Sequence, residues 1–319
     1  MSDHVDILLY GLGAIGSFYA FILSIPPQVQ LSVVCRSNYE AVKARGLQIT
    51  SENHGQHTIT PVQVLRDPSE AGKTFDYIVC AHKAIDQDAV PKRLAPAVGP
   101  NTTLVIIQNG VGNEDPFRAS FPNNTILSCV TWVGATQASP GVIKHTKSED
   151  MQIGLFPNTS LDSSREQQRL QAFARLLTEG KTVFQVVPNV QIQRWEKVVW
   201  NAAWNSLTSM TLLSTHDWLN SSEDATPMTR QLMREVIDVA RACHVPLEYD
   251  LIDRLNAKIL AMPPIGSSMR TDVENGRPLE VDVILGTPVR RAKEKGIQVP
   301  VLQTLYTVMR GIDMRMRNQ

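Results

Sequence analysis

The first half of the chain alternates short apolar runs with longer amphipathic stretches. Four runs rich in β-branched residues predict buried strands, at 5–10, 30–35, 75–80 and 103–107. Helical patterns follow most of them, and such alternation is typical of a doubly wound parallel sheet. Further extended segments, expected to extend or flank that sheet, lie near 126–130, 141–145, 151–155 and 182–186.

Beyond Pro188 the pattern changes to long helical periodicity. Five helices are expected, near 190–213, 226–243, 247–261, 279–295 and 301–315. The proline- and glycine-rich segment 261–278 is expected to be an irregular loop, and loops of that length are often functional. We therefore predict two domains, an α/β domain at 1–188 and an all-helical domain at 189–319.

Composition narrows the class of partner. Among 319 residues, 31 basic side chains balance 31 acidic ones, and hydrophobic residues make up 43%. No long run of one charge predicts a nucleic-acid or anionic-membrane surface, so a small-molecule partner fits better. The four cysteines are widely spaced and form no C-x-x-C pair, which is typical of a reducing, cytoplasmic compartment. We expect no signal peptide, membrane span or metal site, because no such motif occurs.

The stretch YGLGAIGS holds a glycine fingerprint for dinucleotides. Gly11, Gly13 and Gly16 follow a predicted strand in G-x-G-x-x-G spacing and open a helical pattern. Alone the match is weak, but in this context glycines permit a tight turn and close approach of a pyrophosphate. The helix N-terminus would then supply N–H groups to the phosphates.

The end of the second predicted strand indicates which cofactor is bound. An acidic residue there would bind the ribose hydroxyl of NAD, yet no Asp or Glu occurs between Ile7 and Asn38. Arg36 and Ser37 stand in its place, and both suit a 2′-phosphate. We predict NADP(H), while an ordinary surface arginine is the alternative.

Polar side chains past two later strands and on one helix are candidates for the reaction site. Lys83 and Asn109 lie just beyond strand ends, where ligands bind in open α/β sheets. Lys197, Asn201 and Asn205 follow at helical spacing and form one narrow stripe. Each also has an ordinary explanation as a solvated or turn residue.

In this order the motifs resemble the ketopantoate reductases, also called 2-dehydropantoate 2-reductases. The resemblance covers nearly the whole chain and rests on GLGAIG, the arginine after the second strand, HKAIDQ, QNGVG, KVVWNAAWNSLTSM and SSMRTDVENGRPLEVD. It implies an NADP-binding Rossmann domain and a helical substrate domain of the 6-phosphogluconate-dehydrogenase type, with the active site between them. A homodimer is a further possibility.

The resemblance also implies roles for individual residues. The lysine matching Lys197 is the general acid, and the glutamate matching Glu280 pairs with it or with the substrate. The substrate-binding positions match Asn109, Asn201, Asn205 and Ser268. The cofactor-binding positions match Gly11, Gly13, Ala14, Ile15, Gly16, Arg36, Lys83 and Asn109.

Elementary chemistry supports such roles. Hydride transfer to a ketone carbon leaves negative charge on oxygen, and a nearby ammonium both stabilises and protonates that alkoxide. The tryptophans beside Lys197 would lower its pKa, whereas the Glu280 carboxylate would raise it, and the sequence leaves that balance open.

Some positions depart from the family pattern. Ser206 replaces a frequent proline, Arg270 and Thr271 replace a hydrophobic residue and glutamine, and Leu285 replaces a frequent asparagine. Arg270 would add positive charge beside Ser268 and could change anion recognition.

We predict NADPH-dependent reduction of 2-dehydropantoate to pantoate, for pantothenate and coenzyme A synthesis. The alternatives are reduction of another 2-oxo acid, ketone or imine, and a non-catalytic NADPH-binding sensor.

Overall fold

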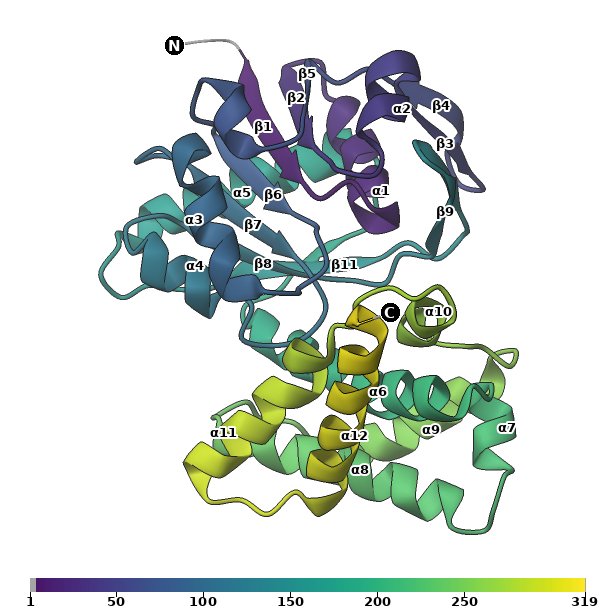
Figure 1. Ribbon diagram of the computed structural model, residues 1–319. Helices are drawn as coiled ribbons and strands as arrows, with labels where there is room; N and C mark the ends of the chain where they lie inside the picture. The colour runs from purple at the N-terminus through teal and green to yellow at the C-terminus, as the bar shows by residue number, and fades with distance from the viewer. Residues whose placement is uncertain (1–3, 319) are drawn as a thin grey trace. The chain divides into compact units, whose positions relative to one another are not determined.

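A computed structural model describes residues 4–318 of the chain. It divides into two compact units (Figure 1). The first comprises the chain up to Gln108 together with Asn113–Val190, and the second comprises Asn109–Gly112 together with the chain from Gln191 onward. The short segment Asn109–Gly112 therefore belongs to the second unit, although the chain on both sides of it belongs to the first.

An eight-stranded sheet forms the centre of the first unit. Its order is β12-β11-β8-β7-β6-β1-β2-β5, and the six strands from β8 to β5 pair in parallel. These strands are β1 (Val5–Tyr10), β2 (Val29–Val34), β5 (Gln63–Leu65), β6 (Tyr77–Cys80), β7 (Thr103–Ile107), β8 (Ile126–Thr131), β11 (Met151–Leu155) and β12 (Gln185–Val186). The predicted parallel sheet is confirmed, and β11 joins it antiparallel to β8.

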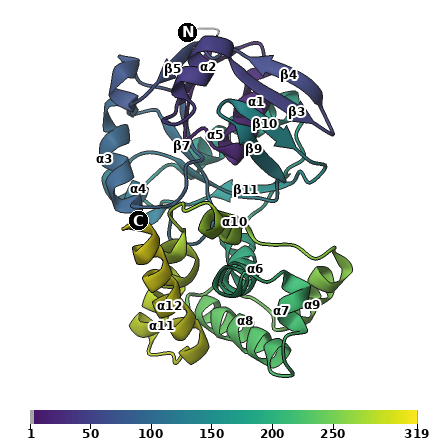
Figure 2. The ribbon, with the colours of Figure 1, turned by 45° about the vertical axis from the view of Figure 1, so that its right-hand side comes forward.

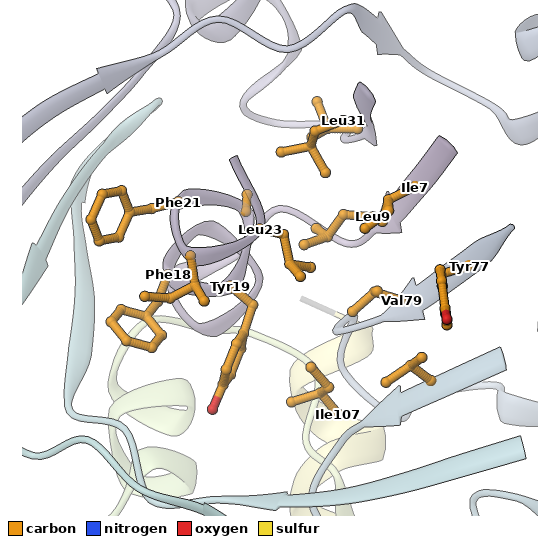
Figure 3. Packing of buried hydrophobic residues seen from close by; sticks show 14 of the residues in the cluster. Ile7, Leu9, Phe18, Tyr19, Phe21, Leu23, Leu31, Tyr77, Val79 and Ile107 are labelled. Atoms are coloured by element: carbon orange, nitrogen blue, oxygen red, sulfur yellow. The ribbon is translucent and has the colours of Figure 1, made fainter. Parts of the chain in front are cut away.

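Helices cover both faces of this sheet, since neighbouring residues of each strand point to opposite sides. Ile7 and Leu9 of β1 pack with α1 and α5 on one face, as Figure 3 shows for α1. Leu8 packs with α3 and α4 on the other. The helices of this unit are α1 (Ala14–Ser24), α2 (Tyr39–Arg45), α3 (Val90–Leu94), α4 (Asp115–Ser120) and α5 (Ser163–Glu179), with 3₁₀ turns η1 (Pro68–Ala71), η2 (Gln87–Ala89) and η3 (Ala95–Ala97).

A second sheet of four strands packs against α1. Its order is β4-β3-β10-β9, formed by β3 (Leu47–Ser51), β4 (Gly55–Ile59), β9 (Ala135–Ser139) and β10 (Val142–His145). Ring contacts join the two, because Phe18 of α1 lies 4.4 Å from the His145 ring centroid. Of these strands the sequence pattern indicated only β10. The strands β4 and β9 are short and polar, whereas the alternating pattern of β3 was missed.

The second unit is helical, and Figure 2 shows its α6 nearly end-on. Its elements are α6 (Val190–Thr211), α7 (Thr215–Leu219), α8 (Ala225–Ala242), α9 (Asp250–Ala261), α10 (Ser268–Glu274), the π-helical turn η4 (Asp282–Gly286), α11 (Thr287–Lys295) and α12 (Pro300–Arg317). Across residues 4–318, none of the helices combines the length and apolar character that a membrane crossing requires.

One expectation for this unit was wrong, and a second was incomplete. The segment 261–278 is not irregular throughout, because Ser267 caps a helix over Ser268–Glu274 by accepting the Arg270 N–H at 3.0 Å. The helix expected at 279–295 is present as a continuous helical segment over 281–295, but its residues Asp282–Gly286 form a π-helical turn before α11 begins at Thr287. Hydrophobic periodicity alone does not detect a capping serine between prolines or a shift in hydrogen-bond register.

Candidate functional site

The glycine-rich loop joins β1 to α1, and two of its glycines have no space for a side chain. Gly11 has φ +102°, and a Cβ there would lie 2.4 Å from the His82 backbone. A Cβ on Gly16 would lie 1.9 Å from the Gly11 carbonyl oxygen. A Cβ on Gly13, by contrast, would meet no atom within 4 Å. Gly13 therefore leaves an open approach to the loop, as a bound pyrophosphate requires.

The N-terminus of α1 faces this opening without a competing group. Gly13 is its N-cap, no side chain caps it, and the first turn holds no acidic residue. The first intrahelical bond runs from the Ser17 N–H to the Gly13 carbonyl, so the N–H groups of Ala14, Ile15 and Gly16 have no partner within the helix. Backbone donors and the helix dipole together suit a phosphate.

The end of β2 presents Arg36 and Ser37 to solvent, while the next residue, Asn38, is buried. The Asn38 amide donates to the Leu12 carbonyl at 2.5 Å and to Gln137 of β9 at 3.0 Å. Its oxygen accepts the Gly141 N–H at 3.2 Å. Asn38 thus fixes the turn that carries Arg36 to the glycine-rich loop, a role the sequence analysis missed because a buried Asn after a strand gives no distinctive signal.

A buried amide and imidazole network lies where β6 and β7 end. Gln108 donates to the His82 carbonyl at 2.9 Å, and Gln87 donates to Gln108 at 2.7 Å. Burial lowers the pKa of His82 to about 4, so the ring is neutral at physiological pH. Lys83, next along the chain, is exposed. These hydrogen bonds fix the position of the His82 backbone beside Gly11, and therefore also the position of the next residue, Lys83.

The predicted polar stripe lies on α6. Asn201 and Asn205 are buried, and Lys197 is partly buried. Burial, with Arg194 and Lys258 nearby, lowers the pKa of Lys197 to about 7, and Glu280 acts in the opposite direction. The balance that the sequence left open is therefore a strongly lowered pKa, which is suited to proton transfer near neutrality.

Glu280 and Asn109 are brought together, although 171 positions separate them. The Asn109 amide donates to Glu280 Oε2 at 3.2 Å. The Val111 N–H donates to the Val283 carbonyl at 3.0 Å within the π-helical turn. A π-helical turn shifts the hydrogen-bond ladder and is frequent at functional sites. Here Val283 in that turn anchors the segment that carries Asn109.

Arg194 was not predicted as a site residue. Its side chain is 1% exposed, and Nη1 donates to the Gly110 carbonyl at 3.0 Å. Gly110 has φ +91°, and a Cβ there would lie 2.6 Å from the Val283 side chain. Arg194 lies three residues before Lys197, so its helical spacing relative to the stripe was an available signal.

Ser268 begins α10, and the residue before it is tied to α6. Thr208 Oγ1 donates to the Ser267 hydroxyl at 2.8 Å, and Thr208 is fully buried. Thr208 lies three residues beyond Asn205, close to the same side of α6. The structure therefore links the Ser268 helix to the helix that carries the stripe.

Two of the departures from the family pattern, Ser206 and Arg270, make contacts within their own helices. Ser206 Oγ donates to the Ala202 carbonyl at 2.5 Å, so this serine bonds back to its own helix. The Arg270 guanidinium pairs with Glu274 of the same helix at 2.8 Å. That partner offsets the positive charge that Arg270 would add beside Ser268.

A Rossmann sheet with an open glycine-rich loop, joined in one chain to a lysine and asparagine stripe on a helix, is typical of two-domain oxidoreductases that use a dinucleotide. Family models match both parts of the chain: "Ketopantoate reductase PanE/ApbA" over residues 7–158 and "Ketopantoate reductase PanE/ApbA C terminal" over residues 189–313. The chain belongs to the ketopantoate reductase family.

Individual relatives agree with this assignment. The chain is 34% identical to a solved 2-dehydropantoate 2-reductase from Methylococcus capsulatus, with a TM-score of 0.86 and 98% of each chain covered. It is 26% identical to the 2-dehydropantoate 2-reductase of a Nostoc species, over 97% of this chain and 95% of that protein. A D-mandelate dehydrogenase solved with NADH and anilino(oxo)acetate shares the fold, at 21% identity, a TM-score of 0.85, and 98% and 99% coverage.

Proposed function

We propose that the protein reduces 2-dehydropantoate to pantoate with NADPH, in the cytoplasm, on the route to pantothenate and coenzyme A. The arrangement around Lys197 carries the proposal: an ammonium with a pKa near 7, the Glu280 carboxylate that raises that pKa, and Asn109 bonded to Glu280. A binding module without chemistry has no use for such an acid, which argues against a sensor.

The proposed domains are 1–188 for the cofactor and 189–319 for substrate and catalysis. The loop from Gly11 to Gly16, including Ala14 and Ile15, would hold the pyrophosphate, with Lys83 and Asn109 nearer the reacting end. Arg36 and Ser37 are exposed and would hold the 2′-phosphate. A bound reduced nicotinamide would supply a hydride to the substrate's carbonyl carbon.

Lys197 and Glu280 are the proposed catalytic residues. Lys197 Nζ would stabilise the negative charge that develops on the carbonyl oxygen and then give that oxygen a proton. Glu280 would keep Lys197 protonated against its burial, because a nearby carboxylate favours the charged ammonium. Asn109 would hold the Glu280 carboxylate in place through its 3.2 Å hydrogen bond.

Asn201, Asn205 and Ser268, with Asn109, are the proposed substrate-binding residues. Asn201 is 7% exposed, and no acceptor among the described residues reaches its Nδ2 atom. Leaving a buried amide donor without an acceptor costs about 1–3 kcal/mol, and a substrate carboxylate or hydroxyl would supply one. Neutral amides can also orient a charged substrate through hydrogen bonds without neutralising its charge.

A turnover assay separates this proposal from its alternatives. Purified protein would be mixed with NADPH and 2-dehydropantoate, beside a panel of other 2-oxo acids, ketones and imines, and NADPH absorbance followed. Turnover confined to 2-dehydropantoate supports the proposal, and faster turnover elsewhere assigns another substrate. NADPH binding without any turnover would identify a sensor.

The cofactor preference is tested by Arg36→Ala. We expect this substitution to weaken the binding of NADPH much more than that of NADH, because only NADPH carries the 2′-phosphate that a guanidinium fork binds. Binding is measured for both dinucleotides by fluorescence titration. Equal losses for the two would contradict the assignment of Arg36.

A further inference from the structure

A second arginine lies beside the proposed 2′-phosphate position, at the end of the neighbouring strand. β2 and β5 are parallel, and Val34 pairs with Leu65, the last residue of each strand. The pairing continues past both ends, because the Cys35 N–H donates to the Leu65 carbonyl at 3.0 Å. Arg66 therefore follows Leu65 at the same sheet edge at which Arg36 follows Cys35.

The Arg66 side chain is held over α2 in a defined orientation. Its guanidinium carbon lies 3.9 Å from the centroid of the Tyr39 ring. Tyr39 is the first residue of α2, and its N–H donates to the Arg36 carbonyl at 3.2 Å. Stacking on an aromatic ring orients the planar fork of an arginine. Arg66 is thus placed against the turn that carries Arg36 and Ser37.

Electrostatics also place Arg66 near this turn. The side chain of Arg66 is 54% exposed, so its charge is open to a ligand from solvent. Burial raises the pKa of Cys35 to about 11, and Arg66 acts on the thiol in the opposite direction. Cys35 directly precedes Arg36, so the positive charge of Arg66 extends to the start of the Arg36 turn.

The partner of Arg66 in this structure is exchangeable. Arg66 Nη2 donates to Glu40, whose side chain is 79% exposed. Exposed ion pairs of this kind contribute little to stability. A phosphate monoester carries more negative charge than a carboxylate and offers three acceptor oxygens.

We propose that Arg66 is a second phosphate-binding arginine, which together with Arg36 and Ser37 binds the 2′-phosphate of NADP(H), and that Glu40 is the resting partner that this phosphate replaces. The inference rests on the proposed NADPH dependence. Two arginines from adjacent strand ends hold one dianion from two directions, which a single arginine cannot do. Arg66 acts on cofactor affinity and has no part in the chemical step.

The test compares two ligands that differ only in the 2′-phosphate, 2′,5′-ADP and 5′-AMP, by calorimetric titration of the full chain. Arg66→Ala should weaken 2′,5′-ADP by roughly 10- to 100-fold, the range for losing a charge-assisted hydrogen bond. It should leave 5′-AMP within about twofold. Glu40→Gln should tighten 2′,5′-ADP, because Arg66 is then released. In turnover, Arg66→Ala should raise KM for NADPH and keep kcat.

Arg45→Ala is the matched control, since Arg45 is an exposed arginine on the same helix as Tyr39. If Arg45→Ala weakened 2′,5′-ADP binding as much as Arg66→Ala does, the loss would reflect only the removal of a positive charge, and the proposal would be overturned. Equal losses for both ligands in Arg66→Ala would also overturn it, as would unchanged binding. If the wild type binds both ligands equally, the NADPH preference itself fails. A preference for 2′,5′-ADP that is undiminished in Arg66→Ala would contradict only the role of Arg66.

Discussion

At the scale of single residues, surroundings decide what a side chain can do. Lysine ordinarily stays charged well above neutral pH, whereas Lys197 has a pKa of about 7. Its position on the stripe was predictable from helical spacing. The lowered pKa depends on burial, on Arg194 of the same helix and on Lys258 of α9, and only the tertiary fold supplies the burial and brings Lys258 close.

Replacing Lys197 tests its role as the acid. Lys197→Ala should lower kcat roughly 10²- to 10⁴-fold, the usual contribution of general acid catalysis. NADPH binding should persist, as measured by fluorescence titration. Lys293→Ala, which removes an exposed lysine on α11, serves as the control. A near-normal kcat in Lys197→Ala would remove this residue from the mechanism.

The pH profile tests the electrostatics around the same residue. Reduction needs protonated Lys197, so kcat/KM should fall as the pH rises through about 7. Glu280→Gln removes the carboxylate that raises this pKa, so the midpoint of the fall should move to lower pH. The measurement is kcat/KM against pH for both proteins. A midpoint that stays fixed or moves upward would show that Glu280 does not act on Lys197.

At the scale of elements, the glycine-rich loop and α10 differ in how well the sequence pattern predicts them. The loop was predicted residue by residue, because strand, glycines and helix follow one another directly. α10 was missed because prolines and glycines surround it, and its start depends on the Ser267 cap. Capping is a local interaction, but it competes with turn chemistry that the same residues also favour.

Two glycine substitutions should change different properties, one the Tm and the other the affinity for NADPH. Gly16→Ala should lower the Tm, because its Cβ would lie 1.9 Å from the Gly11 carbonyl oxygen. Gly13→Ala should keep the Tm but weaken NADPH, since its Cβ meets no protein atom and would lie where a pyrophosphate approaches. Calorimetry and fluorescence titration measure the two effects.

Gly311→Ala in α12 is the control for both glycine variants. Its Cβ also meets nothing, and alanine in an exposed helix is favoured by roughly 0.5–1 kcal/mol, so its Tm should rise slightly. A Gly13→Ala protein that binds NADPH normally would contradict the assigned pyrophosphate position.

At the scale of the whole molecule, assembly as a homodimer stays a prediction. Size-exclusion chromatography with light scattering checks it, with an expected mass of twice the 35.4 kDa chain. A mass of one chain at all accessible concentrations would refute it.

The sequence by itself determined the succession of strands and helices, the glycine fingerprint and the stripe on α6, because strand and helix periods and glycine spacing are local properties. The tertiary structure decided which distant residues meet. Asn109 bonds directly to Glu280, and the π-helical turn anchors the Asn109 segment through Val283. Arg66 stands beside the Arg36 turn through strand register, and Asn38 ties that turn to the glycine-rich loop. Burial and pairing between distant segments set these contacts and the pKa of Lys197, and neither is encoded in any short stretch of sequence.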